Sequence, residues 1–164
     1  MQVIEYEAKY LEDVKDLLVE LEEYIVSIDK DHLDQVHPEY REKMAVLDLE
    51  EVNKNNGKCY LAIENDKAIG LIMGTISSYD EYDIFIGEPK YLSKGIGTLI
   101  VKYVNNYIYE NCLCDFIVLR PFKRNERAVK CYEKSGFEIV DEYVGSDTLG
   151  NKEKMIVLLN KPNN

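Results

Sequence analysis

The sequence has no long apolar run and no targeting pattern at its start. None of its apolar stretches approaches the roughly 20 residues that a membrane-spanning helix needs. The first residues, MQVIEYEAKYLEDV, carry acids where a signal peptide would have a basic segment followed by an apolar one. We therefore expect a cytoplasmic protein that does not bind a membrane.

Positive charge is also scarce. The chain has 20 Lys and Arg against 31 Asp and Glu, which gives a formal net charge of −11. Because nucleic-acid binding relies on clusters of Lys and Arg, we expect no nucleic-acid partner. An acidic cleft would raise the local concentration of a cationic substrate, although the same acidity could simply keep the protein soluble.

Histidine and cysteine are too few and too scattered to predict a metal site. The two histidines, His32 and His37, lie in an early polar segment, and Cys112 and Cys114 are closer together than the usual zinc-binding pair. We expect no metal, and four free thiols that pack as small hydrophobic groups.

The apolar pattern predicts an α/β protein with a mixed sheet. Its 164 residues suffice for a single domain over residues 1–164. Strand-like patterns cover residues 2–8, 58–64, 67–78, 81–87, 114–120, 137–144 and 152–159. Helical patterns cover residues 11–28, 39–55, 96–108 and 125–137. Because the strands come mostly in pairs with helices between them, a regular βαβ series is not expected.

Three of these predictions concern individual residues. The dipeptide ND at residues 65–66 predicts a hairpin turn, and Asn125 and Gly136 are expected to start and stop the last helix. The third helix is expected to bury one apolar face, which consists of Ile96, Leu99, Ile100, Tyr103, Val104, Tyr107 and Ile108.

The stretch YLSKGIGTLIVKYV, residues 91–104, places Gly95 and Gly97 at the mouth of a helix, where the first N–H groups can bind an anion. A P-loop is excluded because no Gly-Lys-Ser/Thr ending is present, and a dinucleotide fingerprint because Ile100 stands where the third glycine is needed. A short turn remains, whose amides between Ser93 and Thr98 would face a diphosphate. Taken alone, a helix start with accidental glycines explains the pattern equally well.

A second motif supports a functional role for the glycine turn. LSKGIG at residues 92–97 and NERAVKCYEKSGF at residues 125–137 together resemble the two signature motifs of the GCN5-related N-acetyltransferase (GNAT) superfamily. The order of the expected elements also fits, so the resemblance covers nearly the whole chain. One departure is Leu92, which stands where the family has Gln or Arg; Lys94 could supply the missing charge as a point charge.

The resemblance implies an acyl-CoA N-acyltransferase fold, with a mostly antiparallel mixed sheet and helices on both faces. It implies direct transfer of an acetyl group from acetyl-CoA to a primary amine, with no acyl-enzyme, and it allows a homodimer. The cofactor-binding residues that it implies are Ile86, Ser93, Lys94, Gly95, Ile96, Gly97, Thr98 and Asn125. Asn125 has an alternative role, because capping its helix alone would explain it.

For the chemistry, the resemblance assigns Tyr132 as the acid that protonates the leaving sulfur, although a tyrosine that merely packs on its helix is the alternative. Asp83 is the first choice for the group that accepts the ammonium proton, because an acid on a central strand is costly to bury unless it is used or paired; Glu81 is the second. Residues 83–98 also resemble the same region of aminoglycoside 6′-N-acetyltransferases, which have an aspartate at the position of Asp83. A solvent-facing charge is the alternative for Asp83.

The acceptor is left open by the sequence. The acid-rich segment 29–50 would suit a cationic amine such as an aminoglycoside, a polyamine or a peptide N-terminus, but a solvated acidic loop explains it as well. A module that senses acetyl-CoA without turnover is the alternative to an enzyme. A purely structural domain would leave Gly95 and Gly97 unexplained.

Overall fold

The computed structural model describes residues 1–28, 49–50, 54, 57–91, 95–111, 114–146 and 150–163. Within these residues the strands are β1 (Gln2–Glu5), β2 (Gly57–Glu64), β3 (Lys67–Tyr79), β4 (Tyr82–Tyr91), β5 (Phe116–Leu119), β6 (Glu138–Ser146) and β7 (Lys152–Asn160). The helices are η1 (Ala8–Tyr10), α1 (Leu11–Ile28), α3 (Gly97–Asn111) and α4 (Glu126–Lys134). The helix expected at residues 39–55 lies mostly outside the described residues.

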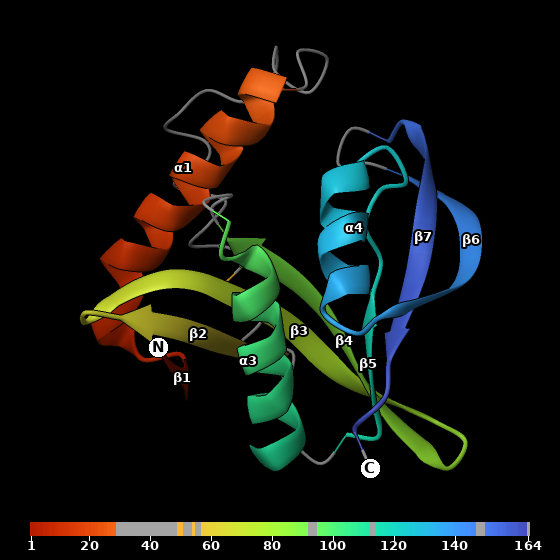
Figure 1. Cartoon of the computed structure of the whole chain (residues 1–164), viewed down its shortest axis with the longest axis horizontal. Helices are drawn as coiled ribbons and strands as arrows, with labels where there is room; N and C mark the ends of the chain where they lie inside the picture. The colour runs from red at the N-terminus through yellow and green to blue at the C-terminus, as the bar shows by residue number, and fades with distance from the viewer. Residues whose placement is uncertain are drawn as a thin grey trace.

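The strands form one seven-stranded sheet in the described part of the chain, in the order β1-β2-β3-β4-β5-β7-β6. Neighbouring strands are antiparallel except β4 and β5, which are parallel because α3 crosses over between them (Figure 1). The expected mixed, mostly antiparallel sheet is therefore confirmed.

Each face of the sheet carries its own apolar cluster. Buried residues of α3 and α4 pack with Tyr60, Ile72 and Phe85 on one face. Buried residues of α1, such as Val14 and Leu17, pack with residues of β2 and β3 on the other face. The expectation of helices on both faces is confirmed, and α3 and α4 lie next to each other (Figure 1).

The local predictions around turns also hold. Asn65 and Asp66 both have positive φ, of 51° and 58°, as a two-residue hairpin turn between β2 and β3 requires. The side chain of Asn125 accepts a hydrogen bond from the Ala128 N–H at 3.2 Å and so caps α4. Gly136 follows the helix with φ of +97°.

The predicted buried face of α3 is confirmed at Ile100, Val104 and Ile108 and wrong at Leu99 and Tyr103. Leu99 and Tyr103 are 49% and 47% exposed, whereas Val101 and Asn105 are buried. Asn105 was not part of the predicted face, and neither polar atom of its side chain has a hydrogen-bond partner among the described residues. Packing against the sheet, rather than side-chain polarity, sets the rotation of this helix.

The thiols are free where the structure describes them. Cys59 is buried, Cys114 and Cys131 are half-buried, and Cys112 lies outside the described residues. Burial raises the pKa of the Cys59 thiol to about 12, so this thiol is unreactive at neutral pH. In the described residues no group of three His, Cys, Asp or Glu side chains could hold a metal ion. No described helix is long and apolar enough to cross a membrane.

Candidate functional site

The parallel strands β4 and β5 separate halfway along β4. They pair from Ile84–Phe116 to Gly87–Leu119, where β5 ends. β4 continues through Glu88–Tyr91 and pairs there with β3 alone in the described part of the chain. The chain after β5 stays with β7, because the Ile156 N–H donates to the Pro121 carbonyl at 3.0 Å. Among the described residues no second strand pairs with β4 beyond Gly87, and β4 and β5 diverge there (Figure 1).

The predicted contact residue Ile86 lies at the closed end of this divergence. It pairs with Val118, one residue before the last pair of the β4–β5 ladder, and is half-buried. A chain-like ligand that followed the free edge of β4 would reach Ile86 at its inner end. Such a ligand would take the place of a strand along this part of β4.

Gly95 and Gly97 are required for two different reasons. Gly95 has φ of +80°, a conformation that favours glycine, and an added Cβ would meet no heavy atom within 4 Å. At Gly97 a Cβ would lie 2.3 Å from Cε2 of Tyr91, so the Tyr91 ring packs directly on the Gly97 backbone. The last residue of β4 is thus fixed against the first residue of α3.

The first N–H groups of α3 have no carbonyl partner among the described residues. The Ile100 N–H donates to the Ile96 carbonyl at 2.9 Å and is the first hydrogen bond of the helix. The N–H groups of Gly97, Thr98 and Leu99 therefore have no carbonyl within the helix, which is the usual condition for anion binding at a helix start. Ile96 is half-buried against the cluster under α3. Ser93 and Lys94, also predicted to bind the cofactor, lie outside the described residues, as does Leu92.

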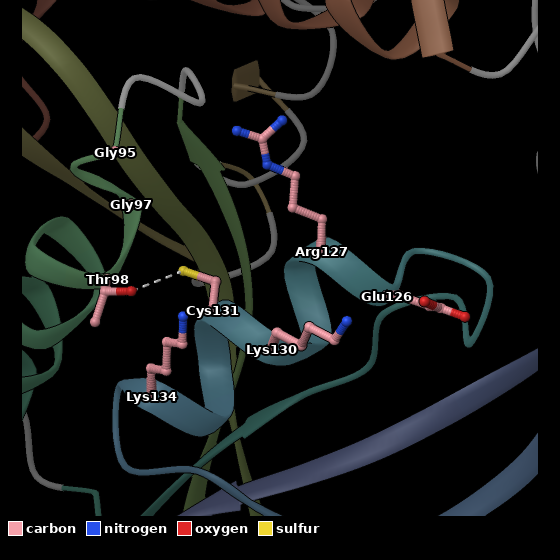
Figure 2. Close-up of a pocket in the computed structure, with 8 residues that line it drawn as sticks. All are labelled: Gly95, Gly97, Thr98, Glu126, Arg127, Lys130, Cys131 and Lys134. Atoms are coloured by element: carbon pink, nitrogen blue, oxygen red, sulfur yellow. Dashed lines mark hydrogen bonds between the residues drawn. The ribbon is translucent and has the colours of Figure 1, made fainter.

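A groove of about 540 Å³ lies between this turn and α4 (Figure 2). It is lined by Gly95, Gly97, Thr98, Glu126, Arg127, Lys130, Cys131 and Lys134. Oγ1 of Thr98 and Sγ of Cys131 are 3.6 Å apart and connect the two helices across it. Its lining carries three cationic side chains and one acid, in a chain whose net charge is −11. The groove is therefore more positively charged than the chain as a whole, which favours an anion there.

Tyr132 lies beneath α4, on the side of the helix that faces the sheet. Its side chain is 6% exposed and its ring contacts Phe137, with centroids 6.2 Å apart. Burial, followed by the nearby Cys131 and Glu88, raises the pKa of the Tyr132 hydroxyl, so the phenol stays protonated at neutral pH. Burial likewise raises the pKa of Tyr91, whose hydroxyl interacts with Tyr132 and Cys131. The two phenols are neutral groups that can donate a proton.

Glu88 is the acid at the opening between the strands, and sequence reasoning missed it. It is the first residue of β4 beyond the β4–β5 ladder, its side chain is 70% exposed, and its carboxylate lies 2.6 Å from the Lys90 ammonium. That ammonium lowers the pKa of Glu88 more than partial burial raises it, so Glu88 is ionised at neutral pH. The signal was available in EPKY, residues 88–91, where an acid stands between the strand and the glycine turn.

Asp83 lies at the other end of β4. Its carboxylate accepts a hydrogen bond from the Ser78 hydroxyl at 2.6 Å, and its backbone N–H donates to the Asp115 carboxylate at 2.8 Å. Five residues of extended strand separate it from Glu88, which corresponds to about 17 Å. Glu81 precedes it in the β3–β4 turn and is exposed. The structure therefore brings Tyr132 and Thr98 close to the groove but leaves both predicted acids apart from them.

Comparison with known proteins identifies the family. The family model described as "Acetyltransferase (GNAT) family" matches residues 18–137, so the chain belongs to this family. The acetyltransferase PseH of Campylobacter jejuni subsp. jejuni serotype O:23/36 (strain 81-176) is 26% identical over 97 residues. That match spans 57% of this chain and 60% of PseH.

Solved structures show the same fold at low sequence identity. A GNAT-family acetyltransferase from Streptococcus pneumoniae is 18% identical, with a TM-score of 0.64 over 98% of this chain and 99% of the other. The aminoglycoside acetyltransferase AAC(6′)-Ib, in complex with ribostamycin and coenzyme A, is 18% identical, with a TM-score of 0.69 over 98% and 92%. A variant of the spermidine N-acetyltransferase SpeG from Vibrio cholerae is 15% identical, with a TM-score of 0.68 over 98% and 95%. The expected acyltransferase fold is confirmed.

Proposed function

We propose that this member of the acetyltransferase family is a single N-acetyltransferase domain that moves an acetyl group from acetyl-CoA to a primary amine. The observation that carries the proposal is the stretch of β4 beyond its ladder with β5, Glu88–Tyr91, whose last residue packs on the start of α3. An extended arm fits the first of these features and a diphosphate fits the second. Coenzyme A has both parts in one molecule.

The residues present fit this cosubstrate. The N–H groups of Gly97 and Thr98, together with the turn at Gly95, would hold the diphosphate. The half-buried Ile86 at the closed end of the opening would contact the pantetheine arm. Asn125 is accounted for by its capping bond, and a further contact with the cofactor stays a prediction. Once bound, acetyl-CoA supplies an activated acetyl group as a thioester.

Two side chains would move the protons. The ionised carboxylate of Glu88 accepts a proton from the acceptor's ammonium group, so that the neutral amine can attack the thioester carbonyl. The protonated hydroxyl of Tyr132 donates a proton to the sulfur as it leaves, and the resulting phenolate takes up the second proton that the attacking nitrogen loses as the amide forms. We propose Glu88 in place of Asp83, because the Asp83 carboxylate is already engaged by Ser78 at the far end of β4.

The acceptor that we propose is a small cationic amine. The exposed carboxylate of Glu88 at the opening favours a positively charged group there, and the acidic chain as a whole attracts one. Two structural neighbours are named for small amines, an aminoglycoside acetyltransferase and a spermidine N-acetyltransferase. These names support the class of acceptor without selecting one member.

The test separates binding from turnover. Calorimetric titration with acetyl-CoA should give micromolar binding, whereas ATP, which has no pantetheine arm, should bind far more weakly. The bound protein is then mixed with aminoglycosides, spermidine and peptide N-termini, and acetylated products are detected by mass spectrometry, since thiol reagents would also react with the protein's own cysteines. Binding with no product from any amine would support a sensor of acetyl-CoA instead. Absence of acetyl-CoA binding would refute both functions.

A further inference from the structure

The outer wall of the groove carries positive charge in addition to the amides at the α3 start. Arg127, Lys130 and Lys134 all line the groove from α4 (Figure 2). Their spacing of three and four residues places them on one side of the helix, along about 10 Å of its axis. In the proposed function the amides of Gly97 and Thr98 would provide one anion site. The row of cations on α4 therefore extends the positive region beyond that site.

From this arrangement we infer that Lys130 and Lys134 form a second phosphate site, which binds the 3′-phosphate on the ribose of coenzyme A. The inference rests on the proposed function, because it assigns a further part of the same cosubstrate. A phosphomonoester carries a charge of about −1.5 to −2 at neutral pH and has three acceptor oxygens. Two ammonium groups one helical turn apart match this charge.

The arrangement of the side chains supports a second phosphate site in the groove. In Figure 2 the Lys134 ammonium turns toward Thr98 and Cys131, whereas Lys130 lies one turn away along the outer side of α4. Lysine is a flexible point charge that can follow a phosphate held at the groove's edge. The acid of the lining, Glu126, comes from the first turn of α4, away from Lys134. Lys134, two turns beyond Glu126, therefore meets no acid among the groove residues, whereas Lys130 follows Glu126 by one turn on the same side of α4.

Local cations are needed here because the rest of the protein repels an anion. The net charge of −11 lowers the affinity for any polyphosphate through its long-range field. Leu92 also stands where the family motif has a Gln or Arg side chain for the phosphates. Two lysines within charge-assisted hydrogen-bonding range of the ligand would offset both effects.

The decisive experiment compares acetyl-CoA with 3′-dephospho-acetyl-CoA. In calorimetric titration of the wild-type chain, the dephospho ligand should bind at least about tenfold more weakly than acetyl-CoA. This is the cost expected when a charge-assisted contact is lost. Equal binding of both ligands would overturn the second phosphate site and leave the proposed function standing. Binding of neither ligand would instead refute the proposed function.

Variants locate the site. Lys130→Met with Lys134→Met should weaken acetyl-CoA binding about tenfold and leave 3′-dephospho-acetyl-CoA within about twofold of the wild type. Lys161→Met is the control, since it removes one positive charge from an exposed residue outside the groove, and it should change neither affinity. An equal loss for both ligands in the double variant would show a general effect of charge and would overturn the assignment to Lys130 and Lys134.

Discussion

The two halves of β4 differ in one respect, and the difference decides what their acids can do. Over Tyr82–Gly87 the strand has β3 on one side, and β5 pairs on the other from Ile84 onward. Over Glu88–Tyr91 only β3 remains in the described structure. Asp83, in the first half, is engaged by Ser78 and Asp115, whereas Glu88, in the second half, faces the opening with Lys90 beside it. The end of β5, rather than residue type, separates an acid in a hydrogen-bonded network from an acid that can meet a substrate.

The largest effect is expected at Tyr132, the buried tyrosine near Glu88. Tyr132→Phe removes the proposed proton donor and keeps the ring that packs on Phe137. We expect kcat to fall by about 10²- to 10³-fold, with acetyl-CoA affinity nearly unchanged. Steady-state kinetics with calorimetry of the same protein sample measures both. An unchanged kcat would leave Tyr132 as a packing residue only.

Replacing each of the two acids of β4 by its amide tests the comparison directly. Glu88→Gln should lower kcat/KM by about 10²-fold, because the amide cannot accept the ammonium proton. Asp83→Asn is the matched control and should stay within about threefold of the wild type, since its carboxylate lies about 17 Å along the strand from Glu88. The reverse result, with the larger loss at Asp83, would restore the original sequence-based choice and refute the role of Glu88.

The stability of the protein should also depend on the contact between Tyr91, at the end of β4, and Gly97. Gly97→Ala places a Cβ 2.3 Å from the Tyr91 ring and should lower the free energy of unfolding by about 1–3 kcal/mol. Gly95→Ala meets no atom and should cost about 1–2 kcal/mol through its positive φ alone.

Chemical denaturation in a second background separates these causes. With Tyr91→Leu, the penalty of Gly97→Ala should largely disappear, because alanine is otherwise the better helix residue. The penalty of Gly95→Ala should persist in the same background. A Gly97→Ala penalty that is independent of Tyr91 would show that the ring contact does not explain this glycine.

The smallest effect concerns pH. The Lys90 ammonium holds the pKa of Glu88 below its usual range, so the carboxylate stays ionised as the pH falls until that lowered pKa is reached. Lys90→Met removes this attraction and should raise the pKa of Glu88. The acid limb of kcat/KM, measured between about pH 4 and 8, should therefore move to higher pH. A limb that does not move would mean that a group other than Glu88 controls it.

The fold was largely predictable because its elements carry strong local signals. The hairpin at Asn65–Asp66 and the cap at Asn125 follow from turn and capping chemistry that operates over a few residues. The buried face of α3 was predicted less well, since Asn105 is buried against its own polarity. That rotation depends on tertiary packing, which a helical pattern does not contain.

The site was predictable only where a motif marks it. Gly95, Gly97 and Tyr132 belong to contiguous motifs, and the structure brings them to neighbouring elements. Glu88 has no motif of its own, and its exposure depends on where β5 ends, a strand that begins at Phe116. The proposal of Glu88 in place of Asp83 therefore depends on the register of two strands that are distant in sequence.

The β4–β5 ladder also has a consequence for how the molecule opens. Its four residue pairs, from Ile84–Phe116 to Gly87–Leu119, are the backbone ladder that joins β1–β4 to β5–β7–β6 in the described chain. A short parallel ladder is where a sheet of this kind separates first, in local fluctuations that amide hydrogen exchange detects. A ligand that bridges both strands would oppose this separation in proportion to its occupancy. The proposed cosubstrate would then hold β4 and β5 together. While it is bound, the amide hydrogens of the two parts of the sheet would exchange as one cooperative unit.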